Sequence, residues 1–327
     1  MRIKWQDNPK VIKKIREAMK TSVVIFPYRR TKVFFWPMKE KSPLPYRLFF
    51  SPEEIKERLV ALPEVNFNLL SQILEKLFPA SLIFRTGDKE YSTLLSETLL
   101  TQLFTPGEEI YFSEWEGDEE FPTGKIEVEP AEGRVFNRPF TVLDIRKNPF
   151  VLEKKGEVGI YDIEEVIGEK IKLAPSLFFS VLLVCTGNTC RSPMAKGILE
   201  TMLKDSRVFI YSAGTDGLRN SPASASAVQV VTKLGGNISR HLSQPLTSEM
   251  IENADLILVM EKRHMIRIID MVPEAKNKTF ILSAYPEREG NDIIDPIGLS
   301  YETFWEIGRE MKIYLERIAQ DIRERLL

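Results

Sequence analysis

The stretch VLLVCTGNTCRSPM at residues 181–194 decides the fold of the C-terminal half of the chain. The run from Phe178 to Val184 is apolar and rich in β-branched residues, which predicts a buried strand. The run from Pro193 to Lys204 predicts a helix, because proline suits the first helical turn. The layout is therefore a strand, a tight loop and a helix. A loop that ends at a helix N-terminus turns its free N–H groups inward and can cradle an anion.

Two residues of this loop suit nucleophilic attack on a phosphoryl group. Five residues separate Cys185 from Arg191, and a helix N-terminus with a nearby arginine lowers the pKa of a cysteine. The planar fork of Arg191 can grip two phosphoryl oxygens. Gly187 lets the backbone approach the anion, and the hydroxyl of Ser192 could donate to the sulfur. A buried structural cysteine beside a surface arginine is the alternative, but the agreement of all these features favours a reactive loop.

A reaction through a phosphocysteine also needs an acid for the leaving group. The segment NDIIDPIGLS at residues 291–300 supplies two carboxylates. Asp295 precedes Pro296, which holds it in an extended or turn conformation, and it is the candidate acid. Asp292 is interpreted as a capping or loop-shaping residue. A simple Asp-Pro turn is the alternative for Asp295.

These segments identify a family resemblance. Residues 179–327 resemble a low-molecular-weight protein phosphatase over the whole domain. The resemblance implies that Cys185 is the nucleophile, that Arg191 binds phosphate, and that Asp295 is the general acid and then the base for water. The matching segments are VLLVCTGNTCRSPMA, YSAGT (211–215), HLSQPLT (241–247), ENADLILVM (252–260) and DIIDP (292–296).

The remaining residues of the loop are predicted to bind the phosphoryl group and the substrate. They are Thr186, Gly187, Asn188, Thr189, Cys190 and Ser192. The resemblance implies in particular that Asn188 and Ser192 shape the loop and support the thiolate. It implies no metal and no cofactor, and phosphorylated proteins as partners.

Thr189 bears on the substrate class. Tyrosine phosphatases of the family usually carry a bulkier aliphatic residue here, whereas bacterial protein-arginine phosphatases resemble this loop more closely. A small hydroxyl leaves room for a planar, polar phosphoguanidinium and offers it a hydrogen bond. Ile297 stands where relatives usually have an aromatic residue after the Asp-Pro pair, which weakens stacking on a phosphotyrosine ring. Phosphoarginine is thus the preferred substrate and phosphotyrosine the rival.

The chain has two cysteines, Cys185 and Cys190. Arsenate reductases of this fold need further cysteines to relay a disulfide, so the resemblance does not extend to that activity. A reactive thiolate beside a second thiol can form a reversible, protective disulfide. The alternative is that Cys190 only packs beneath the loop.

The rest of the C-terminal half alternates between strand and helix. Such alternation predicts a parallel sheet with helices on both faces and a site at the carboxyl ends of the strands. His241 and His264 are interpreted as structural or surface groups. Strands are predicted at 207–213, 255–260 and 278–283, and helices at 223–234, 247–253, 264–271 and from 301 onward.

Residues 1–174 are predicted to form a separate α/β domain, with the phosphatase-like domain at 178–327. The N-terminal part resembles a degenerate YrdC-like (threonylcarbamoyl-AMP synthase-like) domain, a twisted α/β sheet. The similar segments are VVIFP (23–27), MKEK (38–41), LFPASLIF (77–84) and TVLDIRKNPFVLEKKGEV (141–158). Helices are predicted at 9–19, 52–62 and 69–77, and strands at 22–26, 80–85, 109–112 and 140–145.

Several polar motifs of that family are altered, so synthase activity is not expected. Tyr28-Arg29-Arg30-Thr31 replaces a threonine-rich stretch, and the lysine motif reads Lys39-Glu40-Lys41. The basic cluster of Arg29, Arg30 and Lys32 could keep some nucleotide or RNA affinity, or it is a solvated surface. A nucleotide- or tRNA-binding protein with an accessory phosphatase domain is thus the alternative function.

Composition agrees with a cytoplasmic enzyme. The 327 residues are enough for two domains, and the net charge of −2 predicts no general attraction to nucleic acid. Two cysteines make no disulfide framework, the N-terminus lacks an apolar signal core, and no apolar run is long enough to span a membrane. No metal-ligand cluster is evident, and nothing in the sequence indicates an oligomeric state.

Overall fold

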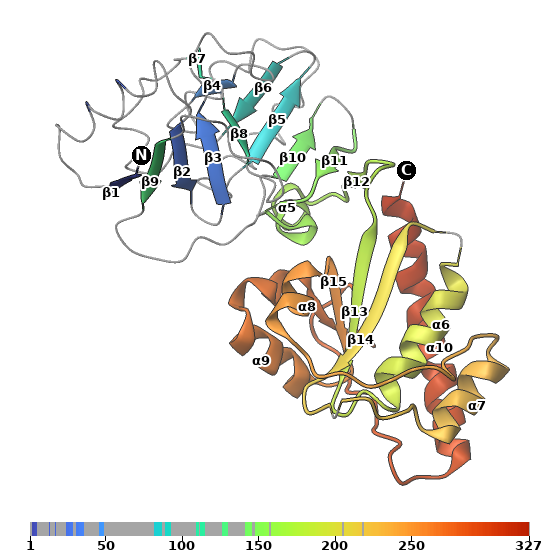
Figure 1. The fold of residues 1–327 in the computed structure, drawn as a ribbon. Helices are drawn as coiled ribbons and strands as arrows, with labels where there is room; N and C mark the ends of the chain where they lie inside the picture. The colour runs from blue at the N-terminus through green and yellow to red at the C-terminus, as the bar shows by residue number, and fades with distance from the viewer. Residues whose placement is uncertain are drawn as a thin grey trace. The chain divides into compact units, whose positions relative to one another are not determined.

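The computed structural model describes residues 141–326 except 146, 147, 157, 205 and 218. Before residue 141 it describes the backbone of short strands, together with Lys13 and Glu17. The chain forms two compact units, Met1–Ala174 and Pro175–Leu327 (Figure 1).

The first unit contains two sheets. A five-stranded sheet has the strand order β1-β9-β2-β3-β8, and a seven-stranded sheet has the order β12-β11-β10-β5-β6-β4-β7. Both sheets mix parallel and antiparallel pairs. The strands are β1 Arg2–Lys4, β2 Val24–Tyr28, β3 Thr31–Phe35, β4 Tyr46–Leu48, β5 Leu82–Thr86, β6 Lys89–Ser92, β7 Glu109–Ile110, β8 Phe112–Glu114, β9 Ile126–Glu129, β10 Thr141–Asp144, β11 Val151–Lys154 and β12 Lys172–Leu173.

All four strands predicted for this unit overlap observed ones, namely β2, β5, β7 with β8, and β10. Of the helix predicted at 9–19, only Lys13 and Glu17 are described, and both are helical. The helices predicted at 52–62 and 69–77 lie outside the described residues. Helix α5, Ile160–Ile167, is an addition to the prediction, and its buried residues recur at helical spacing.

The second unit is a parallel four-stranded sheet with the strand order β14-β13-β15-β16. The strands are β13 Phe179–Cys185, β14 Val208–Gly214, β15 Leu256–Val259 and β16 Thr279–Ile281. β13 lies in the interior, paired along its whole length with β14 and over four residues with β15. Its buried apolar sequence suits a strand that is covered on both faces.

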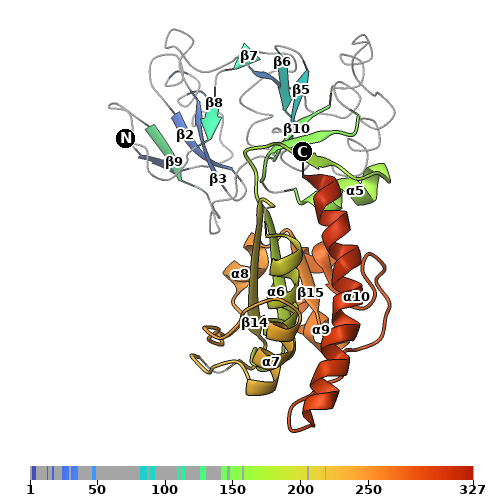
Figure 2. The same cartoon turned by 90° about the vertical axis from the view of Figure 1, so that its right-hand side faces the viewer.

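Helices cover both faces of this sheet, as the sequence predicted (Figure 1). On one side, α6, α7 and α10 contact one another, with α10 running along the other two (Figure 2). α8 and α9 lie on the opposite side, and a short 3₁₀ segment, η1, follows α9. The bounds are α6 Arg191–Met202, α7 Ala225–Lys233, α8 Ser248–Asn253, α9 Lys262–Met271, η1 Pro273–Lys278 and α10 Tyr301–Arg325.

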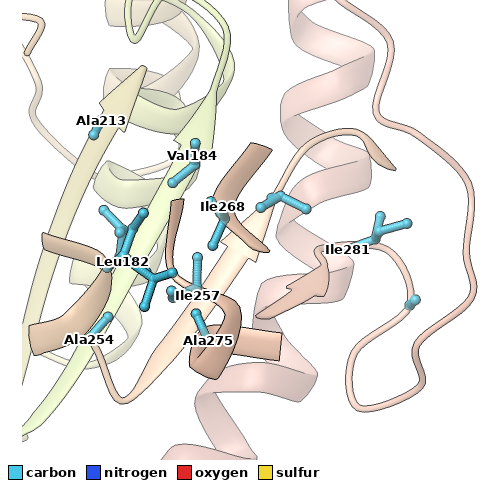
Figure 3. Close-up of a cluster of buried hydrophobic side chains, with 12 residues drawn as sticks. Leu182, Val184, Ala213, Ala254, Ile257, Ile268, Ala275 and Ile281 are labelled. Atoms are coloured by element: carbon cyan, nitrogen blue, oxygen red, sulfur yellow. The ribbon is translucent and has the colours of Figure 1, made fainter. Parts of the chain in front are cut away.

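A hydrophobic cluster joins the sheet to α8 and α9 (Figure 3). Leu182 of β13 and Ile257 of β15 are fully buried there against Ile251 of α8 and Ile268 of α9. Burial of each such side chain stabilises the fold by about 1.5–3 kcal/mol. This packing holds the strands rigidly, so the loops at their carboxyl ends have a firm base. No described helix is long and apolar enough to cross a membrane.

Candidate active site

The loop at residues 186–190 connects β13 to α6 at the carboxyl end of the central strand. Asn188 adopts a left-handed conformation, with φ 55°. Its buried amide Nδ2 donates to the hydroxyls of Ser192, at 2.9 Å, and Ser212, at 3.0 Å, and its Oδ1 accepts from the backbone N–H of Gln244 at 3.0 Å. These bonds offset the cost of the uncommon backbone conformation. Asn188 thus fixes the shape of the loop.

The sulfur of Cys185 is buried at the base of this loop. Its Sγ lies 3.0 Å from Ser192 Oγ and accepts a hydrogen bond from the backbone N–H of Asn188 at 3.3 Å. Burial raises the pKa of the thiol, while Ser192, the charge of Arg191 and the Asn188 N–H act to lower it. The prediction of a lowered pKa is therefore wrong, because burial outweighs these contacts.

Arg191 is buried and forms ion pairs with two carboxylates. Nη1 donates to Glu261 Oε1 at 2.6 Å and to the Ile293 carbonyl at 2.8 Å. Nη2 donates to Asp295 Oδ2 at 2.5 Å and to Thr186 Oγ1 at 3.5 Å. Two carboxylates share the charge of this arginine, so it stabilises a thiolate less than an unpaired arginine would.

The candidate acid lies on the loop that follows β16. The Asp295 side chain is 35% exposed, and its Oδ1 accepts from the backbone N–H of Ile297 at 3.3 Å. Asp292 instead accepts from the backbone N–H of Lys262, at 2.8 Å, at the first residue of α9. The structure thus places Asp295 at Arg191 and gives Asp292 the capping position.

The surrounding loops support this arrangement by close backbone packing. The backbone N–H groups of Thr215 and Asp216 donate to the carbonyls of Cys185, at 2.9 Å, and Thr186, at 3.0 Å. A Cβ on Gly214 would lie 2.5 Å from the Thr186 carbonyl oxygen, so a side chain there would push the loop away. The predicted segment YSAGT therefore acts as a brace for the loop.

A family model for the low molecular weight phosphotyrosine protein phosphatase matches residues 180–326. The low molecular weight protein-tyrosine-phosphatase Etp of Escherichia coli (strain K12) is 36% identical over 154 residues, which are 47% of this chain and 99% of that protein. The chain belongs to this phosphatase family. It is therefore a hydrolase that acts as a low molecular weight protein phosphatase.

Relatives of two specificities match the phosphatase at similar identity. A protein-arginine-phosphatase of Geobacillus stearothermophilus is 37% identical over 145 residues, which are 44% of this chain and 97% of that protein. A protein named as a putative low molecular weight protein-tyrosine-phosphatase, from Klebsiella pneumoniae, is 41% identical over 128 residues, 39% of this chain and 86% of that protein. Overall identity thus does not choose between the two substrates. The YrdC-like resemblance of residues 1–174 lies outside the matched range and stays a prediction.

The phosphatase site contains three residues that the sequence analysis did not select, all at the start of α9. Glu261 Oε1 contacts Arg191, and both of its oxygens contact the exposed Arg263, at 2.8 and 3.0 Å. Burial opposes ionisation of Glu261, but the hydrogen bonds from Arg263 and Arg191 outweigh it and lower its pKa. The available signal was their position directly after strand β15, at the carboxyl edge of a parallel sheet.

The third of these residues, His264, lies nearer the site than predicted. It is buried, and its Nε2 is 3.0 Å from Thr186 Oγ1 and 3.8 Å from Glu261 Oε1. Burial lowers its pKa to about 4. His241 has a structural contact with the same loop, since its Nε2 lies 2.8 Å from the Asn188 carbonyl.

The remaining loop residues are Thr189 and Cys190. Thr189 is partly exposed, and its Oγ1 lies 3.7 Å from Cys190 Sγ. Cys190 is buried with its Sγ 3.5 Å from Ser224 Oγ, and both cysteines are free thiols. The structure thus brings together every residue that the sequence singled out for the site.

Proposed function

We propose that the phosphatase hydrolyses phosphoarginine in preference to phosphotyrosine through a phosphocysteine intermediate. The observation that carries the mechanism is the contact set of Cys185 Sγ, which has a hydroxyl at 3.0 Å and a backbone N–H at 3.3 Å. The backbone N–H donates to the sulfur and the hydroxyl can donate to a thiolate, and Arg191 follows directly after the loop, where it can bind the phosphoryl oxygens.

In the first step, the Cys185 thiolate attacks phosphorus as the bond from phosphorus to the leaving nitrogen or oxygen breaks. Asp295 gives its proton to the leaving group. In the second step, Asp295 takes a proton from water as the water oxygen attacks phosphorus. The phosphorus–sulfur bond breaks, and the thiolate leaves with support from the Ser192 hydroxyl.

The preference for phosphoarginine rests on two residues. Thr189 places a small hydroxyl over Gly187, where it can bond a guanidinium nitrogen and leaves room for the planar group. Ile297 is 68% exposed on the acid loop and offers no aromatic face to a tyrosine ring. The similar protein-arginine-phosphatase of Geobacillus stearothermophilus agrees with this assignment.

The decisive experiment compares kcat/KM on phosphoarginine and phosphotyrosine peptides for wild type and Thr189→Ile. We expect wild type to favour phosphoarginine, and Thr189→Ile to reverse the preference. A preference of wild type for phosphotyrosine would discard the arginine assignment but keep the mechanism.

A second experiment tests the mechanism itself. Acid quenching of an Asp295→Ala variant during turnover should trap phosphate on Cys185, which mass spectrometry would locate. Cys185→Ser serves as the control and should lose turnover. If Cys185→Ser kept wild-type activity, the proposed nucleophile would be wrong.

A further inference from the structure

The guanidinium of Arg191 has acceptors at both terminal nitrogens and none at Nε. Nη1 is held by the Glu261 carboxylate and the Ile293 carbonyl. Nε is buried and has no hydrogen-bond partner among the residues that the structure describes. Nη2 is held by Asp295. A phosphoryl group that binds an arginine by two parallel hydrogen bonds needs two adjacent N–H groups. With Nη1 committed, the edge formed by Nε and Nη2 is the one that remains.

We propose that Asp295 occupies this edge in the free enzyme and that the phosphoryl group of the substrate displaces it. Arg191 then binds the phosphoryl oxygens through Nε and Nη2, and Asp295 becomes free to face the leaving group. This inference rests on the proposed function, since it assigns Arg191 to phosphate and Asp295 to the leaving group. Binding of the substrate and placement of the acid would thus be one coupled event.

The burial of the partners supports displacement of Asp295 rather than of Glu261. The Arg191 side chain is 1% exposed and that of Glu261 is 16% exposed, whereas Asp295 is 35% exposed. A partly solvated carboxylate is the easier of the two to return to water. Glu261 also accepts hydrogen bonds from Arg263 Nε at 2.8 Å and Arg263 Nη2 at 3.0 Å, and these bonds hold it in place.

The backbone around Asp295 also allows the exchange. Its Oδ2 contacts Arg191, while its Oδ1 accepts from the Ile297 N–H at 3.3 Å. The anchor of the loop, a hydrogen bond from the Ile293 N–H to the Met260 carbonyl at 2.8 Å, does not involve the carboxylate. A side-chain rotation therefore releases Arg191 without unfolding the loop.

The unpartnered Nε supplies part of the driving force. A buried N–H without an acceptor destabilises the folded protein, and a phosphoryl oxygen at this position would supply the acceptor. The arriving phosphoryl oxygens also replace the negative charge that Asp295 takes away from Arg191. The free site therefore holds the arginine in its binding orientation before the substrate arrives.

The test measures the dissociation constant of inorganic phosphate by calorimetry at neutral pH. Asp295→Asn keeps the size of the side chain and removes the competing charge, so it should bind phosphate about tenfold more tightly than wild type. Asp292→Asn is the matched control, because it removes a charge from the same loop that does not contact Arg191. It should change the affinity less than about twofold.

Two outcomes would overturn the displacement. One is an Asp295→Asn variant that binds phosphate no more tightly than wild type. The other is an equal gain of phosphate affinity in Asp292→Asn, which would show that removing any nearby negative charge strengthens phosphate binding. These outcomes are separate from the proposed function, because phosphate binding needs no turnover. Failure of the function would appear only as absent hydrolysis of the phosphopeptides.

Side-chain NMR tests directly whether phosphate binds at the edge of Arg191 formed by Nε and Nη2. In protein labelled with ¹⁵N-arginine, the Nε–H signal of Arg191 can be assigned by its loss in Arg191→Lys. Phosphate should move this signal downfield in both wild type and Asp295→Asn, because Nε gains its first acceptor. An Nε–H signal that stays in place when phosphate is bound would exclude binding through this edge.

Discussion

The hydroxyl of Ser192 lies 3.0 Å from Cys185 Sγ and accepts a hydrogen bond from Asn188 Nδ2 at 2.9 Å. The amide donates to the Ser192 oxygen, so the hydroxyl proton can point toward the sulfur when Cys185 is a thiolate. Asn188 therefore orients the hydroxyl that supports the thiolate, in addition to shaping the loop.

Replacing Ser192 should make the thiolate form of Cys185 less stable. In Ser192→Ala we expect the pKa of Cys185 to rise further and kcat to fall by about 10- to 100-fold, because one of the donors to the sulfur is lost. The rate of alkylation by iodoacetamide as a function of pH, measured in a Cys190→Ala background, would report the thiol pKa. Ser212→Ala is the control, since that hydroxyl accepts from the same Asn188 amide as Ser192, and no described contact joins it to the sulfur. An unchanged alkylation profile in Ser192→Ala would contradict the prediction.

Glu261 should act as a positioning residue for Arg191. In Glu261→Gln the charged partner of Nη1 is lost while the size of the side chain is kept, and we expect kcat/KM to fall by about tenfold. Arg263→Ala is the comparison variant: it removes the other partner of Glu261 and a hydrogen bond to Thr186 Oγ1 at 2.9 Å, and it leaves the contact of Glu261 with Arg191 in place. Its kcat/KM should change by less than about threefold. Equal losses of kcat/KM in the two variants would show that the effect does not come specifically from the contact between Glu261 and Arg191.

His264 should make stability depend on pH. Its pKa is about 4 in the folded protein and about 6.5 in an unfolded chain. Between these values the unfolded chain takes up a proton that the folded protein does not, so the free energy of unfolding falls as pH falls from about 6.5 toward 4. Below that range both states are protonated, and His264 makes no further difference.

We expect the free energy of unfolding to fall by about 2 kcal/mol between pH 7 and pH 5 because of His264, after allowance for solvent screening. Urea unfolding of wild type and His264→Asn at pH 7 and pH 5 would measure it. The variant should be less sensitive to the change of pH, although it is less stable overall. If wild type and His264→Asn lost the same free energy of unfolding between pH 7 and pH 5, His264 would not titrate as described.

Gly197 should tolerate no side chain at the contact between α6 and its neighbours. A Cβ there would lie 2.6 Å from Ile238 Cγ2 and 2.7 Å from Val231 Cγ1. Despite the better helix propensity of alanine, we expect Gly197→Ala to lower the free energy of unfolding by about 1–2 kcal/mol.

Thermal unfolding would test this prediction. Glu200→Ala, on the same helix, is the control, because it removes only an exposed ion pair with Lys196 at 3.3 Å and should cost less than about 0.5 kcal/mol. A Gly197→Ala variant that is as stable as this control would show that the contact relaxes easily.

The sequence by itself determined the fold of the second unit and most of the site. The apolar run before Cys185, the loop with Gly187 and the helix after it are local features, so the strand, loop and helix followed from neighbouring residues. The elements predicted from periodicity match those observed within a few residues, from β14 to the long helix α10. Asp295 was found because an Asp-Pro pair is itself a local signal, and the family resemblance gave it a role.

Only the tertiary structure decided how the charges are shared. Glu261, Arg263 and His264 meet the loop because β13 and β15 are neighbours in a parallel sheet, although they are about seventy residues apart in the chain. The raised pKa of Cys185 likewise depends on the burial of its thiol in the folded protein. The pKa of a group depends on the charges and solvent that surround it in space, and a linear pattern of residues does not contain that information.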